Sequence, residues 1–281
     1  MKIILEQKIE DGFNTKKFAI LLDDNNIIEA VSFKKNNHTI CLSSQVGCSV
    51  GCVFCESGKN GLIRNLTAKE IFEQYELVMQ YSEFNKDENG YILFMGIGEP
   101  LLNYDCVKEA VFNIKKNTKE KIIISTVGIK GKIDRIIKDK LDIDLCVSLH
   151  ATNQDQRDEI IPISKMFNYN NLLSEIYSFE KRGKRTLPID INYLLFKNFN
   201  DFKEDALQLV DFFRDRDVRI VVKEPCPISN QKYFMTSSQN AKKFIDILKE
   251  NNINHLFTRS TGREINAGCG QLKSSIVKNI K

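Results

Sequence analysis

Three cysteines, Cys48, Cys52 and Cys55, are the residues whose type and spacing point most directly to chemistry. Their spacing is C-x3-C-x2-C, so one short loop can present three thiolates to a metal. Each thiolate can bind one iron of a cubane 4Fe–4S cluster, and because no fourth ligand is nearby in the sequence, one iron stays open to a substrate. Gly51 allows a tight turn around the metal, and Phe54 is expected to shield it from water.

Zinc is the alternative metal for this loop, because three thiolates and a histidine also form a closed tetrahedral site. The usual pair of C-x2-C knuckles is missing, and the nearest histidine, His38, precedes the loop by ten residues. The spacing therefore favours iron–sulfur over zinc without excluding zinc.

The chain contains eight cysteines, which is unusual for a protein without signs of secretion, since the reducing cytosol seldom supports structural disulfides. Cys106 and Cys146 lie in apolar stretches, where a free cysteine is most often a small core residue. Cys41 precedes the three-cysteine loop closely and joins it in one cysteine-rich segment.

The composition is that of a globular protein. Of the 281 residues, 42% are hydrophobic and 28% are charged, which excludes a disordered, collagen-like or coiled-coil chain. The net charge of +4 permits a nucleic-acid partner without arguing for one. No apolar run approaches the roughly 20 residues that span a bilayer, and no signal peptide is apparent. We therefore expect a cytoplasmic protein with no membrane partner.

The elements that position the cysteine loop follow from the hydrophobic pattern. Residues 18–22 and 27–33 flank a polar turn and predict a β-hairpin. From Thr39 onward, β-rich apolar runs alternate with amphipathic stretches, which indicates βα units with a parallel sheet. The strands of these units are expected near residues 39–44, 90–95, 121–126, 143–149, 187–196 and 218–224, with a final strand near 256–258.

Helix signals lie between these strands. Thr67 and Glu70 fit a capping box, followed by Ile71, Phe72, Tyr75 and Val78 on one helix face. A second helix is expected over 172–181, ending at Gly183, with later helices over 202–215 and 238–250.

The fold class expected from this pattern is α/β, a partial (β/α)6 TIM-like barrel with a small N-terminal β-hairpin. We expect the hairpin extension over residues 1–36 and the barrel over 37–281. In such a barrel the reactive end is formed by the loops that follow the carboxyl ends of the strands, and the cysteine loop follows the first strand.

The cysteine spacing resembles that of the radical S-adenosylmethionine (SAM) enzymes, and longer strings resemble the RlmN and Cfr family of RNA adenine methyltransferases. The strings that carry this likeness are residues 41–48, 64–66, 94–103, 148–151, 157–163 and 267–272. The resemblance extends over roughly residues 17–277. The three-cysteine motif alone would name only the superfamily, whereas the strings around Cys41 and Cys269 are specific to this branch.

This resemblance implies a radical SAM barrel in which Cys48, Cys52 and Cys55 hold a 4Fe–4S cluster. SAM would dock on the open iron and be cleaved to a 5′-deoxyadenosyl radical. Gly98 and Glu99 match the segment that receives the SAM amino group. The other matched SAM contacts, all at expected strand ends, are Ser125, Ser148, Leu149 and His150.

One matched SAM position differs from the family pattern. Cys226 stands where the family has an asparagine that contacts SAM. A thiol is a weak hydrogen-bonding group on a shorter side chain, so this contact to SAM is expected to be altered or lost.

The resemblance also assigns a reactive pair of cysteines and a base. Cys269 matches the residue that accepts a methyl group from a second SAM, which makes two SAM molecules per turnover. A radical on that methyl carbon would add to an adenine carbon and tie the RNA to the protein. Cys41 matches the residue that forms a disulfide with Cys269 as the RNA is freed, and Glu29 matches a carboxylate that removes the adenine proton.

The implied activity is methylation of an adenine carbon, with carbon 2 favoured over carbon 8, in 23S rRNA or tRNA. A reductant such as flavodoxin or ferredoxin would supply electrons, and a monomer is expected. Family members usually carry an N-terminal helical RNA-binding domain, whereas about 16 residues precede the hairpin here. Candidate RNA contacts are three basic groups: Lys115, Lys116, Lys119 and Lys121; Lys130, Lys132, Arg135, Lys138 and Lys140; and Lys181, Arg182, Lys184 and Arg185.

Two other functions remain open from the sequence. The same radical chemistry could act on a different substrate, such as a peptide or small molecule, which the short N-terminus and Cys226 motivate. The chain could also be a non-catalytic iron–sulfur module that senses redox state.

Overall fold

The structure is a computed structural model that describes residues 1–34, 36–85, 88–182, 185–229 and 232–273. The chain forms two compact units. The first unit comprises residues 1–51, 55–125 and 261–281, and the second comprises residues 52–54 and 126–260.

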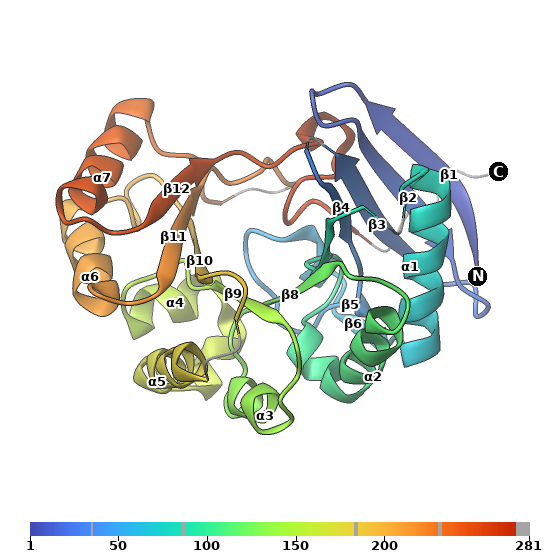
Figure 1. The fold of residues 1–281 in the computed structure, drawn as a ribbon. Coiled ribbons are helices and arrows are strands. Elements are labelled where there is room, and N and C mark those ends of the chain that lie inside the picture. Colours follow the sequence, from blue (N-terminus) through green and yellow to red (C-terminus); the bar gives the residue numbers. More distant parts are fainter. Residues whose placement is uncertain (35, 86–87, 183–184, 230–231, 274–281) are drawn as a thin grey trace. The chain divides into compact units, whose positions relative to one another are not determined.

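The first unit contains a mixed sheet in the order β1-β2-β3-β4-β7-β8. Its strands are β1 (Lys2–Ile9), β2 (Thr15–Leu21), β3 (Ile27–Lys34), β4 (His38–Cys41), β7 (Gly90–Phe94) and β8 (Lys121–Thr126). The first four strands pair antiparallel, whereas β4, β7 and β8 pair parallel. The predicted hairpin is confirmed as β2 and β3, and β1 adds an edge strand that we did not expect (Figure 1).

The remaining elements of the first unit surround the cysteine loop. They are β5 (Gln45–Gly47), η1 (Glu56–Gly58), β6 (Leu62–Asn65), α1 (Ala68–Ser82), η2 (Pro100–Asn103), α2 (Tyr104–Lys115) and η4 (Arg263–Ile265). The capping box of α1 is confirmed: the Glu70 amide donates to the Thr67 hydroxyl at 3.2 Å, and the Thr67 amide donates to the Glu70 carboxylate at 2.8 Å. The apolar face of α1 buries Ile71, Tyr75 and Val78 as predicted.

The second unit contains four parallel strands in the order β9-β10-β11-β12. They are β9 (Asp144–Ser148), β10 (Ile189–Leu194), β11 (Val218–Lys223) and β12 (His255–Thr258). The helical elements of this unit are α3 (Lys132–Lys138), which precedes β9, and α4 (Gln154–Ile160), η3 (Pro162–Met166), α5 (Tyr169–Lys181), α6 (Lys203–Phe213) and α7 (Ser238–Glu250), which lie between the strands in sequence. In Figure 1, α6 and α7 lie along one side of β11 and β12. The expected cap at Gly183 lies outside the described residues.

The inner parallel strands β10 and β11 are apolar because both of their faces are covered, whereas Leu256 and Phe257 of the edge strand β12 are exposed. In β10, Ile189, Ile191 and Tyr193 are buried, and in β11 Ile220 and Val222 are buried. All the strands expected from the sequence are present within a few residues of the predicted bounds, in the alternating βα order of a partial TIM-like barrel.

Two other expectations concern the whole chain. β3 is hydrogen-bonded to β4, so the N-terminal strands continue into the sheet of the first unit. The domain boundary expected at residue 36 stays a prediction.

Within the described ranges, every helix is too short or too polar to cross a membrane.

Candidate active site

The three-cysteine loop follows β5 and is shaped by glycines with positive φ. Gly47 has φ +77°, and a Cβ there would lie 2.1 Å from the Gly61 carbonyl oxygen. That same carbonyl accepts a 2.9 Å hydrogen bond from the Cys48 amide. Gly51 has φ +71°, which agrees with the tight turn expected at this position. The backbone therefore holds Cys48 in place through a close approach that only glycine permits.

The thiols of the loop are distributed over both units. Cys48 and Cys55 belong to the first unit and Cys52 to the second. Burial, with smaller contributions from the nearby Glu99 carboxylate and Cys55 thiol, raises the pKa of Cys48 to about 12. Burial also raises the pKa of Cys55. Among the described residues, no three His, Cys, Asp or Glu side chains are gathered closely enough to hold a metal ion.

The loop that follows β7 places Glu99 near Cys48. Gly98 has φ +105°, and a Cβ there would lie 2.7 Å from the Ser44 hydroxyl oxygen and from the Gln45 Cβ. The Glu99 amide donates to the Gln45 side chain at 2.9 Å, and the Glu99 carboxylate accepts from the Leu101 amide at 3.0 Å. The carboxylate is buried and fixed at the start of η2, as a binding group for an ammonium ion should be.

Sequence reasoning gave no role to the polar side chains that brace this loop. Asn103 donates 2.8 Å hydrogen bonds to the carbonyls of Ser44 and Leu66. The side-chain oxygen of Gln45 accepts the hydrogen bond from the Glu99 amide. Both residues lie inside the strings that resemble the RlmN and Cfr family, which was the available signal.

The segment that carries Cys269 is anchored to the end of the cysteine loop. The Glu56 amide donates to the Gly270 carbonyl at 2.7 Å, and the Ser57 hydroxyl donates to the Leu272 carbonyl at 2.7 Å. Cys269 itself is exposed, with its Sγ 3.8 Å from the Sδ of Met95, just beyond β7. The first unit thus brings Cys269 to the reactive end of its parallel strands.

Cys41 and the Cys269 segment share one hydrophobic cluster. Val31, Ile97, Ala267 and Leu272 form its buried part, and Cys41 packs against it. Cys41 is half-buried at the carboxyl end of β4. No disulfide joins Cys41 to Cys269 in this structure, and the disulfide implied by the family resemblance stays a prediction for one step of the reaction.

Glu29 also contacts this C-terminal segment. It is buried in β3, two residues before Val31, and its carboxylate accepts a 2.8 Å hydrogen bond from the Lys273 amide. Lys17, on β2, forms an ion pair with it at 3.3 Å. Burial raises the pKa of Glu29, and the Lys17 charge opposes that rise. The first unit therefore gathers all three predicted reactive residues around one segment.

The predicted SAM contacts fall in both units. Gly98, Glu99 and Ser125 lie in the first unit, with Ser125 buried in β8. Ser148 ends β9 in the second unit, followed by the buried Leu149 and His150. All of them stand at or just beyond the carboxyl ends of strands, as expected.

His150 is fixed as a neutral imidazole. It is 4% exposed, and burial together with the Arg157 charge holds its pKa well below the usual value. Its Nδ1 accepts a 3.0 Å hydrogen bond from the Leu194 amide, which places the proton on Nε2. The Phe54 ring packs edge-on against the imidazole, with 4.9 Å between the two ring centroids, so Phe54 covers His150 within the second unit.

Arg157 is a positioning residue. It lies in one of the strings that resemble the RlmN and Cfr family, but no individual role could be predicted for it from the sequence. Its buried guanidinium donates to the carbonyls of Ser148 (3.0 Å), Leu149 and Val127. These carbonyls belong to the loops after β8 and β9, so Arg157 fixes the backbone that carries the predicted SAM contacts of the second unit.

Cys226 follows β11 and is buried between two prolines. It lines a small cavity with Val53, Phe54, Phe196, Pro225, Ile228 and Tyr233. The residue therefore lies beside Phe54 of the cysteine loop, where a contact to a cofactor is expected, although its thiol replaces an amide.

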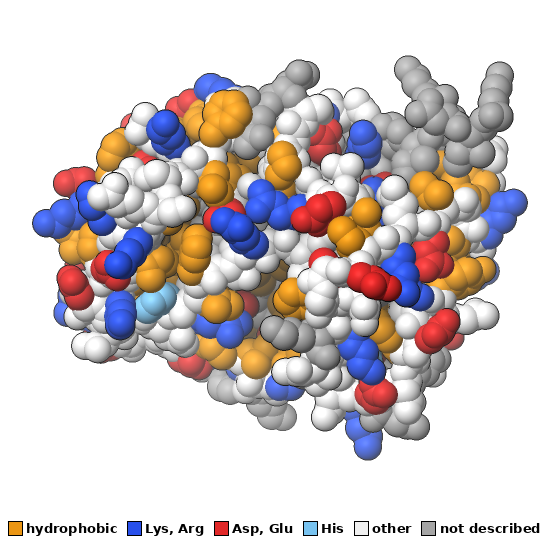
Figure 2. Space-filling model, turned by 90° about the horizontal axis from the view of Figure 1, so that it is seen from above, with side chains coloured by type: hydrophobic (Ala, Val, Ile, Leu, Met, Phe, Trp, Pro, Cys, Tyr) orange, Lys and Arg blue, Asp and Glu red, His pale blue; other side chains and the backbone are white. Residues whose placement is uncertain are grey.

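Two members of the third basic group make contacts within the second unit, and the role of the three groups in RNA binding stays a prediction. Arg182 donates to the carbonyls of Leu141 and Ile143, and Arg185 is paired with Asp217 at 2.5 Å. Lys184 lies outside the described residues. On the face shown in Figure 2, Lys and Arg side chains are interspersed with Asp and Glu.

Comparisons with known proteins decide the family. Residues 42–213 match the model of the radical SAM superfamily. A probable dual-specificity RNA methyltransferase RlmN of Dictyoglomus turgidum is 37% identical over 276 residues, covering 96% of this chain and 78% of the relative. The chain belongs to the RlmN family of radical SAM enzymes.

Other relatives agree with this membership. An RlmN protein of Trichodesmium erythraeum, named in the same way, is 38% identical over 267 residues and covers 94% of this chain and 76% of the relative. The crystal structure of a radical SAM methyltransferase from Sphaerobacter thermophilus has a TM-score of 0.89 and 28% identity over 98% of this chain and 81% of that chain. The expected radical SAM fold is thereby confirmed.

Membership in the RlmN family gives the chain its cofactors, a 4Fe–4S cluster and SAM. The donor set of the cysteine loop fits the cluster, because three thiols without a neighbouring histidine suit iron–sulfur better than zinc. The raised pKa values of Cys48 and Cys55 mean that these thiols ionise readily only beside a cation, as cluster iron provides.

Proposed function

We propose that this protein methylates an adenine carbon in RNA through a methyl group carried on Cys269. The observation that supports this most is the convergence of Cys269, Cys41 and Glu29 on one segment of the first unit, tied to the end of the cysteine loop by the Glu56 and Ser57 hydrogen bonds. A non-catalytic iron–sulfur module would have no use for this arrangement.

Cys269 acts first, as a nucleophile. Its exposed thiol loses a proton, and the thiolate takes the methyl group of one SAM by displacement at the sulfonium carbon. The cluster, held by Cys48, Cys52 and Cys55, supplies when bound the electron that cleaves the second SAM. Cys269 then holds the activated one-carbon unit against the adenine, which cannot attack SAM with its own carbon.

Glu29 serves as the base that removes the proton from the adenine carbon. Its carboxylate is fixed by the Lys273 amide, and its pKa is raised by burial, which suits a group that must accept a proton. The ion pair with Lys17 opposes this rise in the pKa of Glu29.

Cys41 releases the product. Its thiolate bonds to Sγ of Cys269, and the bond from Sγ to the one-carbon unit breaks with its electron pair going to carbon, which is then protonated. The one unpaired electron that the adduct has carried since the radical addition would pass to a one-electron acceptor, a role that the oxidised cluster would fill when bound. The shared hydrophobic cluster around Cys41, Ala267 and Leu272 supports such an approach. An external reductant, of the flavodoxin or ferredoxin kind, restores the two thiols.

The substrates we propose are 23S rRNA and tRNA, with carbon 2 of adenine preferred over carbon 8. The dual-specificity RNA methyltransferase names of the relatives support RNA substrates of two kinds. We propose that the protein acts as a monomer in the cytoplasm, where these RNAs are found.

The proposal is tested by incubating reconstituted protein, SAM and a reductant with 23S rRNA fragments and with tRNA, and by analysing digested RNA for methyladenosines. We expect 2-methyladenosine. Formation of 8-methyladenosine would correct the carbon, and 5′-deoxyadenosine without any RNA product would show that the chemistry serves another substrate. The absence of both products from a cluster-loaded protein would favour the redox-sensing module.

A further inference from the structure

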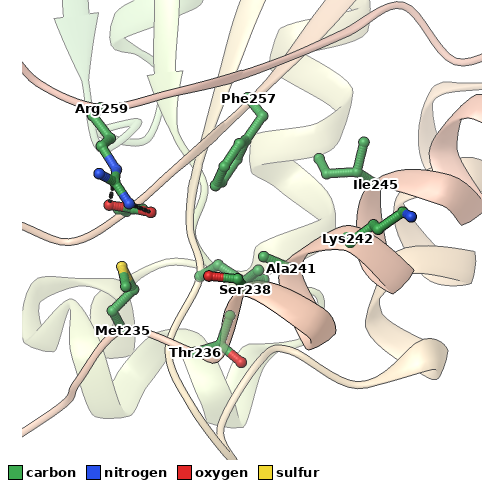
Figure 3. A pocket seen from close by; sticks show the side chains of 10 residues that line it. Met235, Thr236, Ser238, Ala241, Lys242, Ile245, Phe257 and Arg259 are labelled. Atoms are coloured by element: carbon green, nitrogen blue, oxygen red, sulfur yellow. Dashed lines mark hydrogen bonds and ion pairs between the residues drawn. The ribbon is translucent and has the colours of Figure 1, made fainter.

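A cavity of about 270 Å³ lies in the second unit at the carboxyl ends of three neighbouring strands. Leu195 follows β10, Glu224 follows β11, and Phe257 and Arg259 lie at the end of β12. The opposite wall is the first turns of α7, from Ser238 to Ile245 (Figure 3). This is the end of a parallel sheet at which barrel enzymes bind their substrates.

One loop of the chain, the loop after β11, contributes both to this cavity and to the predicted cofactor pocket. Glu224 lines the cavity, and Cys226, two residues later in the same loop, stands at the predicted SAM position. A ligand in this cavity would therefore lie close in sequence to a predicted SAM contact of the second unit.

The apolar part of the lining offers an aromatic face. Phe257 is 43% exposed, and Met235 and Ile245 lie on either side of it in the cavity wall. Exposed aromatic rings in concave sites are typical stacking platforms for nucleobases. The volume, just below the range of about 300 to 1,000 Å³ of drug-sized pockets, suits one base or nucleotide.

The charged part of the lining favours an anionic ligand. Arg259 is 65% exposed and is held by two contacts to the buried Glu224, Nε to Oε2 at 2.5 Å and Nη2 to Oε1 at 2.8 Å. Lys242, exposed on α7, adds a second cation. With two cations against one carboxylate, the rim is positive, and a bidentate pair keeps the guanidinium plane in a fixed orientation.

We infer that this cavity binds one nucleotide of a single-stranded RNA segment, its base stacked on Phe257 and its phosphate beside Lys242 and Arg259. The inference rests on the proposed function and adds to it a place where the second unit binds the RNA. Because base stacking accepts any base, the site contributes affinity with little sequence preference.

The test measures binding of a fluorescein-labelled single-stranded RNA of about ten nucleotides to the cluster-loaded protein by anisotropy. Phe257→Ala removes the ring and should weaken binding about tenfold. Leu256→Ala is the matched control, since Leu256 is equally exposed on the same strand but does not line the cavity. Both variants are checked for unchanged thermal unfolding.

A second pair of variants tests the charge. Lys242→Gln should lower the slope of log affinity against log salt by about one, whereas Lys243→Gln, on the adjacent exposed residue outside the cavity, should leave it unchanged. Equal RNA affinity of Phe257→Ala and Leu256→Ala would overturn the inference and leave a peptide as the occupant to consider. Absence of RNA methylation by the wild-type protein would instead contradict the proposed function, so the two failures are distinguishable.

Discussion

The amide of Glu56 donates a 2.7 Å hydrogen bond to the carbonyl of Gly270. Glu56 follows Cys55, the proposed cluster ligand, and Gly270 follows Cys269, the proposed methyl carrier, so this bond joins the two segments that the proposed reaction brings together. Residues more than two hundred positions apart in the chain are thus held together by main-chain atoms, independently of their side chains.

If Cys41 resolves the bond between Cys269 and RNA, then Cys41→Ala should stop the reaction after carbon–carbon bond formation. The variant should accumulate protein covalently bound to RNA and release no methylated product, because no second thiol can attack Cys269. Denaturing gels with labelled RNA measure the adduct. Cys106→Ala, a change at a half-buried cysteine on α2, should behave as wild type. Product release by Cys41→Ala would exclude the assigned role.

Lys17 should set the pH range in which Glu29 works. Its positive charge opposes the rise in the pKa of Glu29 that burial causes, so Lys17→Met should raise that pKa further. Because a base must be deprotonated, the acidic limb of the pH–rate profile should move to higher pH. Lys16→Met, which changes a partly exposed neighbour, should leave the profile in place.

The same substitution has a consequence for stability. A carboxyl whose folded pKa lies above its unfolded value, 4.5, favours folding most at low pH, and this contribution is lost as pH rises through the folded pKa. Lys17→Met should therefore destabilise the protein by about 3 kcal/mol at neutral pH and by less near pH 4. Chemical unfolding at both pH values measures the difference, and equal losses at both would contradict the pairing.

Cys226→Asn should strengthen SAM binding. The amide restores a hydrogen-bonding group where the family has one, and a net gain of about 0.5 to 1.5 kcal/mol corresponds to a decrease in the KM for SAM of about two- to tenfold. Cys226→Ala should leave the KM near that of the wild type, because a thiol contributes little hydrogen bonding. A higher KM in Cys226→Asn would show that the pocket has adapted to the smaller side chain.

Gly47 should be necessary for cluster retention. A Cβ at this position would lie 2.1 Å from the Gly61 carbonyl, whereas at Gly61, which also has a positive φ, a Cβ meets nothing within 4 Å. Both alanine variants bear the same left-handed backbone cost of about 1 to 2 kcal/mol, but only Gly47→Ala displaces the Cys48 amide. Iron and sulfide analysis should show loss of the cluster in Gly47→Ala alone, and equal contents in the two variants would contradict this explanation.

The fold could be predicted from the sequence wherever periodicity was strong. The apolar runs of β8, β9 and β11 and the Thr67 capping box gave both the type and the approximate bounds of their elements. β1 was missed because it is an edge strand whose side chains alternate weakly between exposed and partly buried positions. Its pairing with β2 is a tertiary contact, which a local pattern does not contain.

The candidate chemistry-bearing residues and the residues that position them differ in the signal that they leave in the sequence. Cys269 and Cys41 are predicted because their strings resemble a known family. Arg157 and Asn103 lie in such strings too, but they act through hydrogen bonds to the carbonyls of residues distant in the chain, so no local property of the sequence indicates their role. In the third basic group, Arg182 and Arg185 make contacts inside the second unit, which a run of basic residues does not predict.

Methylation of Cys269 tests the account most directly. Protein with a reconstituted cluster is incubated with SAM labelled on its methyl group, digested, and analysed by mass spectrometry, with Cys269→Ser as the matched control. The account predicts one labelled methyl group on the peptide that contains Cys269, and none on that peptide in the variant or on the peptide that contains Cys106. An unlabelled Cys269 in a protein that holds its cluster and cleaves SAM would contradict the central claim.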